Sequence, residues 1–349
     1  MLLRDFVRDE QIDNRMCVLF DEGEIYNELK ETTNNKVFSL KDKNKNKKEI
    51  VKALEGYCKK EKIDIVTLHH GGINCNLIYM MLKKKMPQLK YAKYFHSSFD
   101  KYWGGRENKI KDIITKVVMQ KAINKSDLLI FISKAVKKSF CDTFKINDNK
   151  CAIVYNGINN KFIEMKPKKK ENTNNITYIG RLEKLKGVEV LIKAFEEIQQ
   201  AIPQTKLTIV GDGKEKSNLE KLSKQLELNN NIEFAGRQND VIKFLDENNI
   251  FVYPSICQEG FGISVAEAMS RGCIPVTFKQ GGLPELIEDG ENGFMVQEVN
   301  SKELARKIIE VIKLSEKEKL EISQNAINTA RKFSITNTIQ MLKNAYEIL

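Results

Sequence analysis

The chain has 349 residues, of which 41% are hydrophobic and 30% charged, and its formal net charge is +11. This length and composition predict a soluble globular protein of about two domains. No apolar run reaches the roughly 20 residues of a membrane-spanning helix, and acidic residues within 1–10 are atypical of a secretory signal. The seven scattered cysteines and three histidines argue against a disulfide framework, a zinc site and a histidine-rich metal centre, and favour a cytoplasmic location.

The positive charge is concentrated in the first half of the chain. Residues 1–170 contain 36 basic and 21 acidic residues, whereas the remainder contains 22 and 26. This asymmetry indicates an anionic partner for the first half, which could be nucleic acid, an anionic membrane or an acidic substrate. A general bias toward lysine and asparagine is the alternative explanation.

Short β-branched runs alternate with longer amphipathic segments along the chain. Strands are predicted at 16–20, 37–40, 63–68, 91–95, 128–132, 152–154, 176–179, 206–210, 232–234, 250–252 and 274–277. Helices are predicted at 49–60, 106–124, 188–200, 218–227 and 261–271. Such alternation builds parallel sheets with helices on both faces, and the number of strands favours two doubly wound α/β units. The turn-rich stretch at 162–175 has no apolar periodicity and is predicted to link them.

The first half opens unusually for a doubly wound nucleotide-binding unit. Such a unit begins with a buried strand and a glycine-rich turn. Here a helix-like segment at 2–10 precedes the first predicted strand, and Gly23 is the first glycine. We therefore expect an N-terminal domain that lacks its first strand, and weakened or no activity unless about 20–30 upstream residues are restored.

Cations and glycines follow several strands of the second half. Arg181 and Lys186 lie five residues apart after the strand at 176–179, a spacing that suits a diphosphate, although a solvated loop would look similar. Gly213 and Arg237 follow the next two strands. These turns should share the carboxyl edge of one sheet, where open α/β sheets bind ligands.

The most informative segment surrounds two glutamates, Glu259 and Glu267, with seven residues between them. The loop Gly260, Phe261 and Gly262 should deliver backbone N–H groups and the start of a helix at Ile263 to an anion. Glu259 could then accept hydrogen bonds from a sugar, and Glu267 from a ribose. The alternative is a helix with ordinary acidic residues.

These motifs resemble those of the family-4-type retaining glycosyltransferases, also described as glycosyl transferases group 1, which have the GT-B fold. The resemblance rests on residues 180–187, 210–213, 281–287 and 292–294 with the two glutamates, and more loosely on 64–70, 95–98, 133–136 and 155–158. It implies two Rossmann-like domains facing a cleft. Residues 1–165 would bind the acceptor, 166–330 the nucleotide-sugar donor, and a helix at 331–349 would pack back on the first domain.

The resemblance also implies a role for each matched residue. Arg181 and Lys186 would bind the donor diphosphate and stabilise the leaving nucleotide, Glu259 would contact the transferred sugar, and Glu267 the ribose. The backbone of Gly260, Phe261, Gly262 and Ile263 would support sugar and phosphate, with Gly213 in the donor turn and Arg237 beside the base. His96 would reach the sugar from the first domain; a buried strand-end histidine is the alternative. Glu259, His96, Arg181 and Lys186 form the predicted catalytic set.

The implied activity is retaining transfer of a hexose-type sugar from a nucleoside-diphosphate sugar, with UDP as the expected nucleotide. The acceptor would be a glycan or lipid-linked molecule in cell-surface polysaccharide or glycolipid synthesis. No Asp-x-Asp motif lies near a donor-site strand, so no metal or cofactor is expected. A catalytically impaired subunit remains the alternative. No nucleic-acid recognition motif is present, and the absence of an early Gly-x-Gly-x-x-Gly argues against a nicotinamide dehydrogenase.

The region 81–150 has 17 basic and 6 acidic residues, and its segment 106–121 is amphipathic and lysine-rich. Such a surface suits an anionic leaflet, which predicts peripheral contact with the inner face of the cell membrane. The alternative is an ordinary surface helix whose apolar side packs on the sheet.

Overall fold

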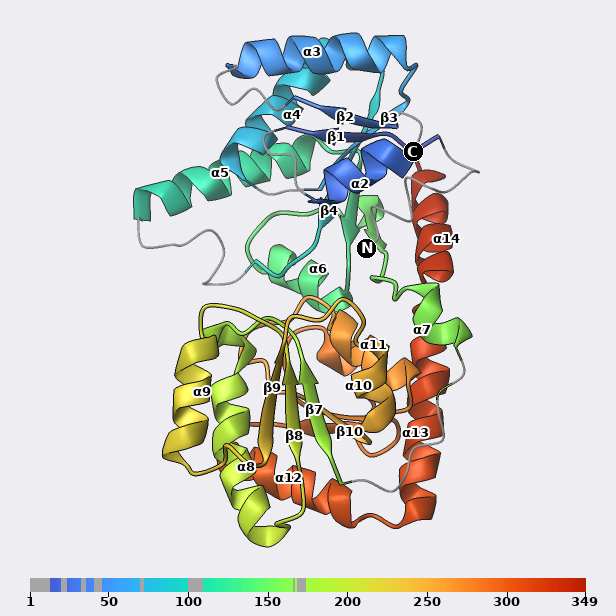
Figure 1. Ribbon diagram of the computed structural model, residues 1–349. Coiled ribbons are helices and arrows are strands. Elements are labelled where there is room, and N and C mark those ends of the chain that lie inside the picture. Colours follow the sequence, from blue (N-terminus) through green and yellow to red (C-terminus); the bar gives the residue numbers. More distant parts are fainter. Residues whose placement is uncertain are drawn as a thin grey trace. The chain divides into compact units, whose positions relative to one another are not determined.

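Two separately packed units make up the chain in the computed structural model, which describes residues 13–19, 24–32, 36–40, 46–69, 72–99, 109–165, 167 and 174–349 (Figure 1). Unit 1 contains Met1–Gly157 and Ile335–Leu349, and unit 2 contains Ile158–Ser334. The predicted changeovers at 165/166 and 330/331 lie within eight residues of these positions. The difference at the first boundary has a physical cause, because residues 158–165 pack on unit 2.

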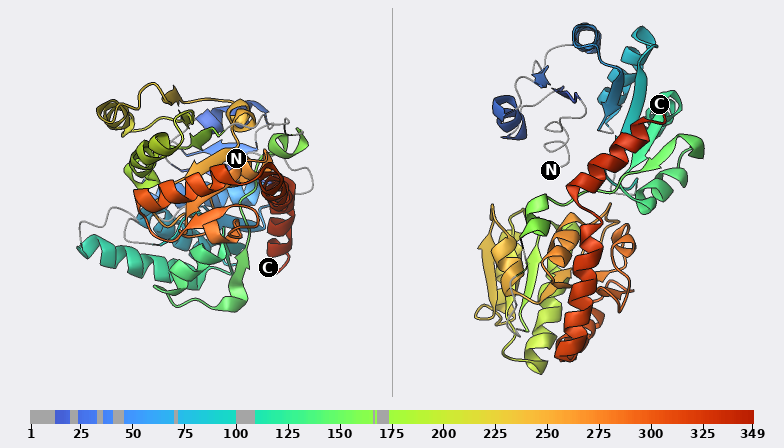
Figure 2. Two further views of the ribbon diagram at one scale, coloured as in Figure 1. Left: turned by 90° about the horizontal axis from the view of Figure 1, so that it is seen from below. Right: turned by 90° about the vertical axis from the view of Figure 1, so that its right-hand side faces the viewer.

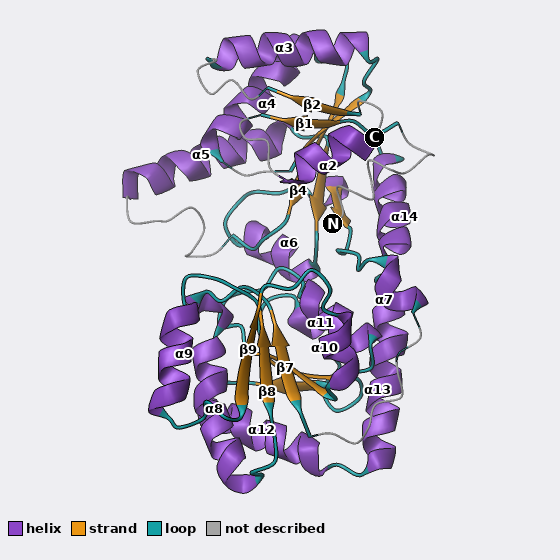
Figure 3. Ribbon diagram, in the orientation of Figure 1, coloured by secondary structure: helices purple, strands orange, loops and turns teal. Residues whose placement is uncertain are grey.

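Unit 2 is built on a six-stranded parallel sheet with the order β12-β11-β10-β7-β8-β9. Its strands are β7 (Ile176–Ile179), β8 (Leu207–Val210), β9 (Ile232–Gly236), β10 (Ile250–Tyr253), β11 (Ile274–Phe278) and β12 (Phe294–Val296). Its α-helices are α7 (Asn160–Glu164), α8 (Val188–Ala201), α9 (Lys216–Gln225), α10 (Ile242–Glu247), α11 (Ile263–Ser270), α12 (Ser301–Lys313) and α13 (Glu316–Arg331). Figure 3 shows helices on both sides of the sheet. The strand order reverses between β7 and β10, which creates the switch point where such sheets bind ligands.

A buried ion pair helps to attach residues 158–165, where the chain first enters unit 2, to the rest of that unit. The guanidinium of Arg271 is fully buried and binds both carboxylate oxygens of Asp246, at 2.8 and 2.9 Å. Its remaining nitrogen donates to the backbone carbonyl groups of Phe162, at 3.4 Å, and Met165. These contacts explain why α7 belongs to unit 2 rather than to unit 1.

Unit 1 contains a four-stranded parallel sheet with the order β3-β4-β5-β6 and a separate parallel pair, β1 with β2. The strands are β1 (Met16–Val18), β2 (Val37–Ser39), β3 (Ile65–Leu68), β4 (Lys90–Phe95), β5 (Leu128–Phe131) and β6 (Cys151–Ile153). The helices are α2 (Glu24–Thr32), α3 (Lys47–Lys60), α4 (Ile73–Lys85), α5 (Lys109–Lys125), α6 (Lys134–Cys141) and α14 (Ile335–Tyr346). Side chains of the β1–β2 pair pack against the same core as α3 and α4. The predicted helix at 2–10 lies outside the described residues.

The C-terminal helix α14 packs on unit 1, and Figure 2 shows it in red beside that unit's strands. The Tyr346 hydroxyl and the Thr67 hydroxyl on β3 are 2.7 Å apart. A side chain at Gly157 would place its Cβ 2.6 Å from the Cα of Ile335, so these segments touch backbone to backbone. One residue further into unit 2, the amide of Ile158 donates to the Phe333 carbonyl at 2.9 Å. The two points where the chain passes between the units therefore lie side by side.

Lys93 on β4 gives unit 1 a pH-dependent stability. The residue is 1% exposed, its ammonium group donates to the Asn76 side chain at 2.7 Å, and burial lowers its pKa to about 7. At position 93 the unfolded chain, with an ordinary lysine pKa, binds more protons than the folded chain above pH 7. This group alone should therefore raise the free energy of unfolding from pH 7 to 9, by up to about 1.4 kcal/mol per pH unit, whereas the raised pKa values of Cys17 and Cys151 act in the opposite direction.

Denaturant unfolding at both pH values tests this, with Lys93→Met expected to lose that slope and Lys90→Met, exposed on the same strand, expected to keep it. The same pH dependence in Lys93→Met and in the wild type would contradict the assignment.

Candidate active site

Lys186 and Glu259, which are 73 residues apart, form an ion pair at the carboxyl edge of the unit 2 sheet. The Lys186 Nζ lies 2.6 Å from the Glu259 Oε1, and the two side chains are only 14% and 11% exposed. Lys186 follows β7 and Glu259 follows β10, and these strands are direct neighbours at the switch point. The structure thus brings together two residues of the predicted catalytic set.

The loops after β7 and β10 are stacked on each other by backbone contacts. The Ile256 amide and the Ser255 hydroxyl both lie within hydrogen-bond distance of the Leu185 carbonyl, at 3.0 and 3.3 Å. Gly187 has a left-handed φ of 68°, and a Cβ there would lie 1.9 Å from the Pro254 carbonyl oxygen. Glycine is therefore required for this close approach.

A second loop supports the backbone around Glu259. The Gly282 amide donates to the Glu259 carbonyl at 2.7 Å, and the Gly281 amide donates to the Gln258 side chain at 3.1 Å. Gln258 in turn donates to the Gln280 side chain at 2.8 Å. The glycines of the 281–287 motif therefore hold the glutamate loop from behind.

Helix α11 begins directly after this loop. Gly262 is its N-cap residue and provides no capping side chain, so the first-turn amides and the positive end of the helix dipole face the loop. Phe261 is buried against Phe333, with ring centroids 5.1 Å apart, which fixes the entry into the helix. The predicted Gly260–Ile263 backbone thus forms a helix start that can bind an anion.

Glu267 lies on α11, about one turn beyond Ile263. Burial raises the pKa of its carboxyl group to about 7, against the opposing effect of Lys161. No hydrogen bond joins this carboxyl group to another described residue. A half-buried carboxyl group of this kind can accept hydrogen bonds from a diol that displaces its water.

The other predicted donor residues lie on the same sheet edge. The Arg181 guanidinium is 71% exposed and pairs with Glu183 at 2.8 Å, so it does not contact Lys186 or Glu259 in this structure. A Cβ at Gly213 would lie 2.3 Å from the Leu182 carbonyl oxygen, which places the turn after β8 against the loop after β7. Arg237 is exposed just beyond the end of β9.

His96 lies in unit 1, one residue after β4. Its Nε2 is 3.0 Å from the Nδ1 of His69, and its ring stacks on Tyr94 with centroids 4.5 Å apart. Burial and the neighbouring His96 lower the pKa of His69 to about 3, so His69 is neutral. The proposed reach of His96 to a sugar bound in unit 2 stays a prediction.

Three residues without a predicted role surround Glu259. The hydroxyls of Ser255 and Tyr253 donate to its Oε1 at 2.5 and 3.2 Å, and the Cys257 Sγ lies 3.6 Å from the same oxygen. No local pattern marks these residues, because only the loop after β10 brings the Glu259 carboxylate back to their side chains.

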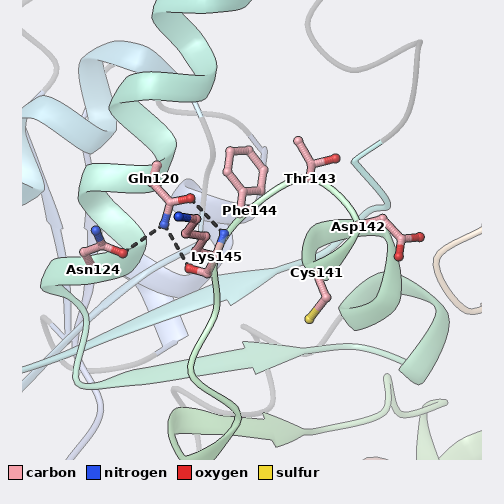
Figure 4. Close-up of a pocket in the computed structure, with 7 residues that line it drawn as sticks. All are labelled: Gln120, Asn124, Cys141, Asp142, Thr143, Phe144 and Lys145. Atoms are coloured by element: carbon pink, nitrogen blue, oxygen red, sulfur yellow. Dashed lines mark hydrogen bonds between the residues drawn. The ribbon is translucent and has the colours of Figure 1, made fainter.

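A surface groove in unit 1 contains none of these residues (Figure 4). It is lined by Gln120, Asn124, Cys141, Asp142, Thr143, Phe144 and Lys145. The Gln120 side chain bonds the backbone N–H and carbonyl of Lys145 and the Asn124 side chain, each at 2.9 Å. The Gln120 amide thus connects the two walls of the groove, and its nitrogen and oxygen are already hydrogen-bonded within the protein.

Two further properties concern only the described part of the chain. It contains no group of three or more His, Cys, Asp or Glu side chains placed to share a metal ion. That the chain transfers a sugar without a metal ion nevertheless stays a prediction. Among the described helices, none combines the length and apolar character needed to cross a membrane.

Comparison with known proteins identifies the family. Residues 159–333 match the family described as "Glycosyl transferases group 1", and residues 10–162 match "Glycosyltransferase Family 4". An uncharacterized glycosyltransferase of Methanocaldococcus jannaschii is 29% identical over 76% of this chain and 69% of its own length. A Campylobacter jejuni N-acetylgalactosaminyltransferase, whose name gives a diphospho-undecaprenol-linked acceptor, is 29% identical over 55% of this chain and 52% of its own length.

The fold is also that of solved glycosyltransferases. The crystal structure of Anabaena HepE in complex with UDP matches with a TM-score of 0.82 and 21% identity, covering 100% of this chain and 95% of that one. A glycosyltransferase from Rickettsia africae matches with a TM-score of 0.81 and 20% identity, covering 99% and 93% of the two chains. The chain therefore belongs to the glycosyl transferases group 1 family and is a glycosyltransferase with the GT-B fold.

Proposed function

We propose that this glycosyltransferase transfers a hexose-type sugar from a UDP-sugar, with retention of configuration, to a glycan or lipid-linked acceptor of cell-surface polysaccharide or glycolipid synthesis. The observation that carries the proposal is the Lys186–Glu259 pair beside the uncapped start of α11. It offers a cation and a helix end for a diphosphate, with a carboxylate next to them for sugar hydroxyls. The UDP in HepE and the lipid-linked acceptor of the Campylobacter enzyme support the two substrate classes.

The proposed chemistry is mainly electrostatic. As the glycosidic bond to the diphosphate breaks, positive charge develops on the sugar and negative charge on the leaving group. Lys186, Arg181 and the α11 N-terminus would stabilise the diphosphate, and this kind of stabilisation is usually the largest catalytic contribution. Attack by the acceptor on the same face of the sugar would give retention, and His96 would complete the site from unit 1.

Removal of the Lys186 charge should slow the reaction strongly. In Lys186→Met, kcat for UDP release from the accepted UDP-sugar should fall by about 10²–10³, as when one preorganised donor is removed from an active site. Glu259→Gln should lower the rate as well, because the carboxylate is lost.

A nucleotide-release assay with a panel of UDP- and GDP-sugars measures both variants, and Lys193→Met, whose exposed ammonium pairs with Glu189 on α8, is the control. An unchanged rate in Lys186→Met would reject the mechanism. A wild-type chain that binds UDP but turns over no donor would favour the impaired-subunit alternative.

The raised pKa of Glu267 predicts pH-dependent donor binding. Ribose hydroxyls bind best to the ionised carboxylate, so below pH 7 the free site must first lose a proton. The Kd of UDP-glucose should therefore be about tenfold weaker at pH 6 than at pH 8. Isothermal titration should show this dependence in the wild type and lose it in Glu267→Gln; the same pH dependence in both proteins would refute the role.

We also propose that unit 1 contacts an anionic membrane through α5, which lies at the left of that unit in Figure 1. The side chains of Ile110, Ile113, Ile114 and Val117 follow a helical i, i+3, i+4, i+7 spacing and are 47–70% exposed. An ordinary surface helix would turn such a stripe toward the sheet. The helix has five lysines and one acidic residue, so anionic headgroups complement its charge.

Vesicle flotation tests this contact. Binding to vesicles with 30% phosphatidylglycerol should fall about fivefold for each lysine removed, as in Lys121→Gln. The double variant Ile113→Ser/Val117→Ser should lose binding, whereas Leu320→Ser, at a still more exposed apolar position on α13, should keep it. Wild-type protein that fails to float at low salt would reject the proposal.

A further inference from the structure

One oxygen of the Glu259 carboxylate receives every contact that the side chain makes with described residues. Oε1 lies 2.6 Å from the Lys186 Nζ, 2.5 Å from the Ser255 hydroxyl, 3.2 Å from the Tyr253 hydroxyl and 3.6 Å from the Cys257 Sγ. The second oxygen, Oε2, has no such contact. A carboxylate oxygen has two lone-pair sites, so Oε1 has no capacity left for a ligand.

We propose that Ser255 and Tyr253 are positioning residues, which hold Oε1 so that Oε2 is the oxygen that accepts a hydrogen bond from the donor sugar. This inference rests on the proposed function and assigns two residues to it. Ser255 and Tyr253 are 0% and 6% exposed, so water does not compete for their hydroxyl groups. Tyr253 is the last residue of β10 and Ser255 lies two residues beyond it, so both are attached to the edge of the sheet.

The hydroxyl groups of Ser255 and Tyr253 are needed because Lys186 must also bind the donor diphosphate. Its Nζ also lies 3.1 Å from the Tyr253 hydroxyl, and an ammonium group has three donors. A bound diphosphate competes for this cation and weakens its hold on Glu259. The two neutral hydroxyls carry no charge that a diphosphate attracts, so they keep the carboxylate in place while Lys186 turns to the phosphates.

The state of the Tyr253 hydroxyl fits this role. Burial and the neighbouring Glu259 raise its pKa well above the ordinary value, so it remains a protonated donor at every working pH. Its ring is fixed by near-parallel stacking against Tyr178 and Phe251, with interplanar angles of 13° for both pairs. The Ser255 hydroxyl can in turn accept from the Cys257 thiol, 3.3 Å away.

The test separates nucleotide binding from sugar handling. UDP and UDP-glucose serve as the two probes, together with kcat and KM on the accepted donor. In Tyr253→Phe and in Ser255→Ala, the Kd of UDP should stay within twofold of wild type, while kcat should fall about tenfold. The gain in affinity from UDP to UDP-glucose should shrink, and the double variant should lose about a hundredfold in kcat. Ser255→Thr, which keeps the hydroxyl, should restore the rate.

Tyr91→Phe is the matched control, because among the described residues its buried hydroxyl donates to the Met86 carbonyl alone, within unit 1. It should match the active-site variants in thermal stability but leave both Kd values and kcat unchanged. Wild-type kcat in the double variant, or an equal loss of UDP and UDP-glucose binding, would overturn the positioning role alone. A wild-type chain that binds no nucleotide would instead overturn the proposed function.

Discussion

The ion pair between Lys186 and Glu259 is the interaction on which the site depends. It joins the ends of two adjacent parallel strands where the strand order reverses, and it is nearly excluded from water. Loss of one partner from a buried pair typically costs about 3–5 kcal/mol, since the other charge is left uncompensated. The glycines around the pair allow the two loops to approach closely. Any side chain at Gly187 or Gly281 would push apart the loops that bring the two charges together.

Much of this architecture could be read from the sequence. Every predicted strand is present with ends within two residues of the prediction, because short apolar runs between amphipathic segments mark most strands of a parallel sheet. The strand β12 was not predicted, since it lies in a turn-rich segment between Asn292 and Asn300. Lys186 and Glu259 were recognised from motifs, but their mutual contact depends on strand order, which no local pattern encodes.

Tertiary packing explains what sequence reasoning could not reach. Tyr253 and Ser255 are visible as ordinary strand-end residues, and only the fold of the following loop turns Glu259 back toward them. The amphipathic segment of α5 was predicted, but not that Ile110 and Ile113 would remain exposed. Exposure is decided by the neighbours of a helix rather than by its own periodicity. The pairing of His96 with His69 likewise follows from two parallel strands ending together.

The adjacent crossing points have an evolutionary consequence. Gly157 and Ile335 touch within unit 1, and Ile158 pairs with Phe333 at the matching edge of unit 2. Unit 2 is one continuous insertion in the sequence of unit 1, and the two positions where it joins unit 1 lie next to each other. Exchange of the whole module that contains Lys186 and Glu259 would need two breakpoints in the gene, after residues 157 and 334, and the remaining chain would then join Gly157 to Ile335, which already touch. Unit 2 is suited to exchange as one piece in this way, because domain insertion is tolerated where the chain ends lie close together.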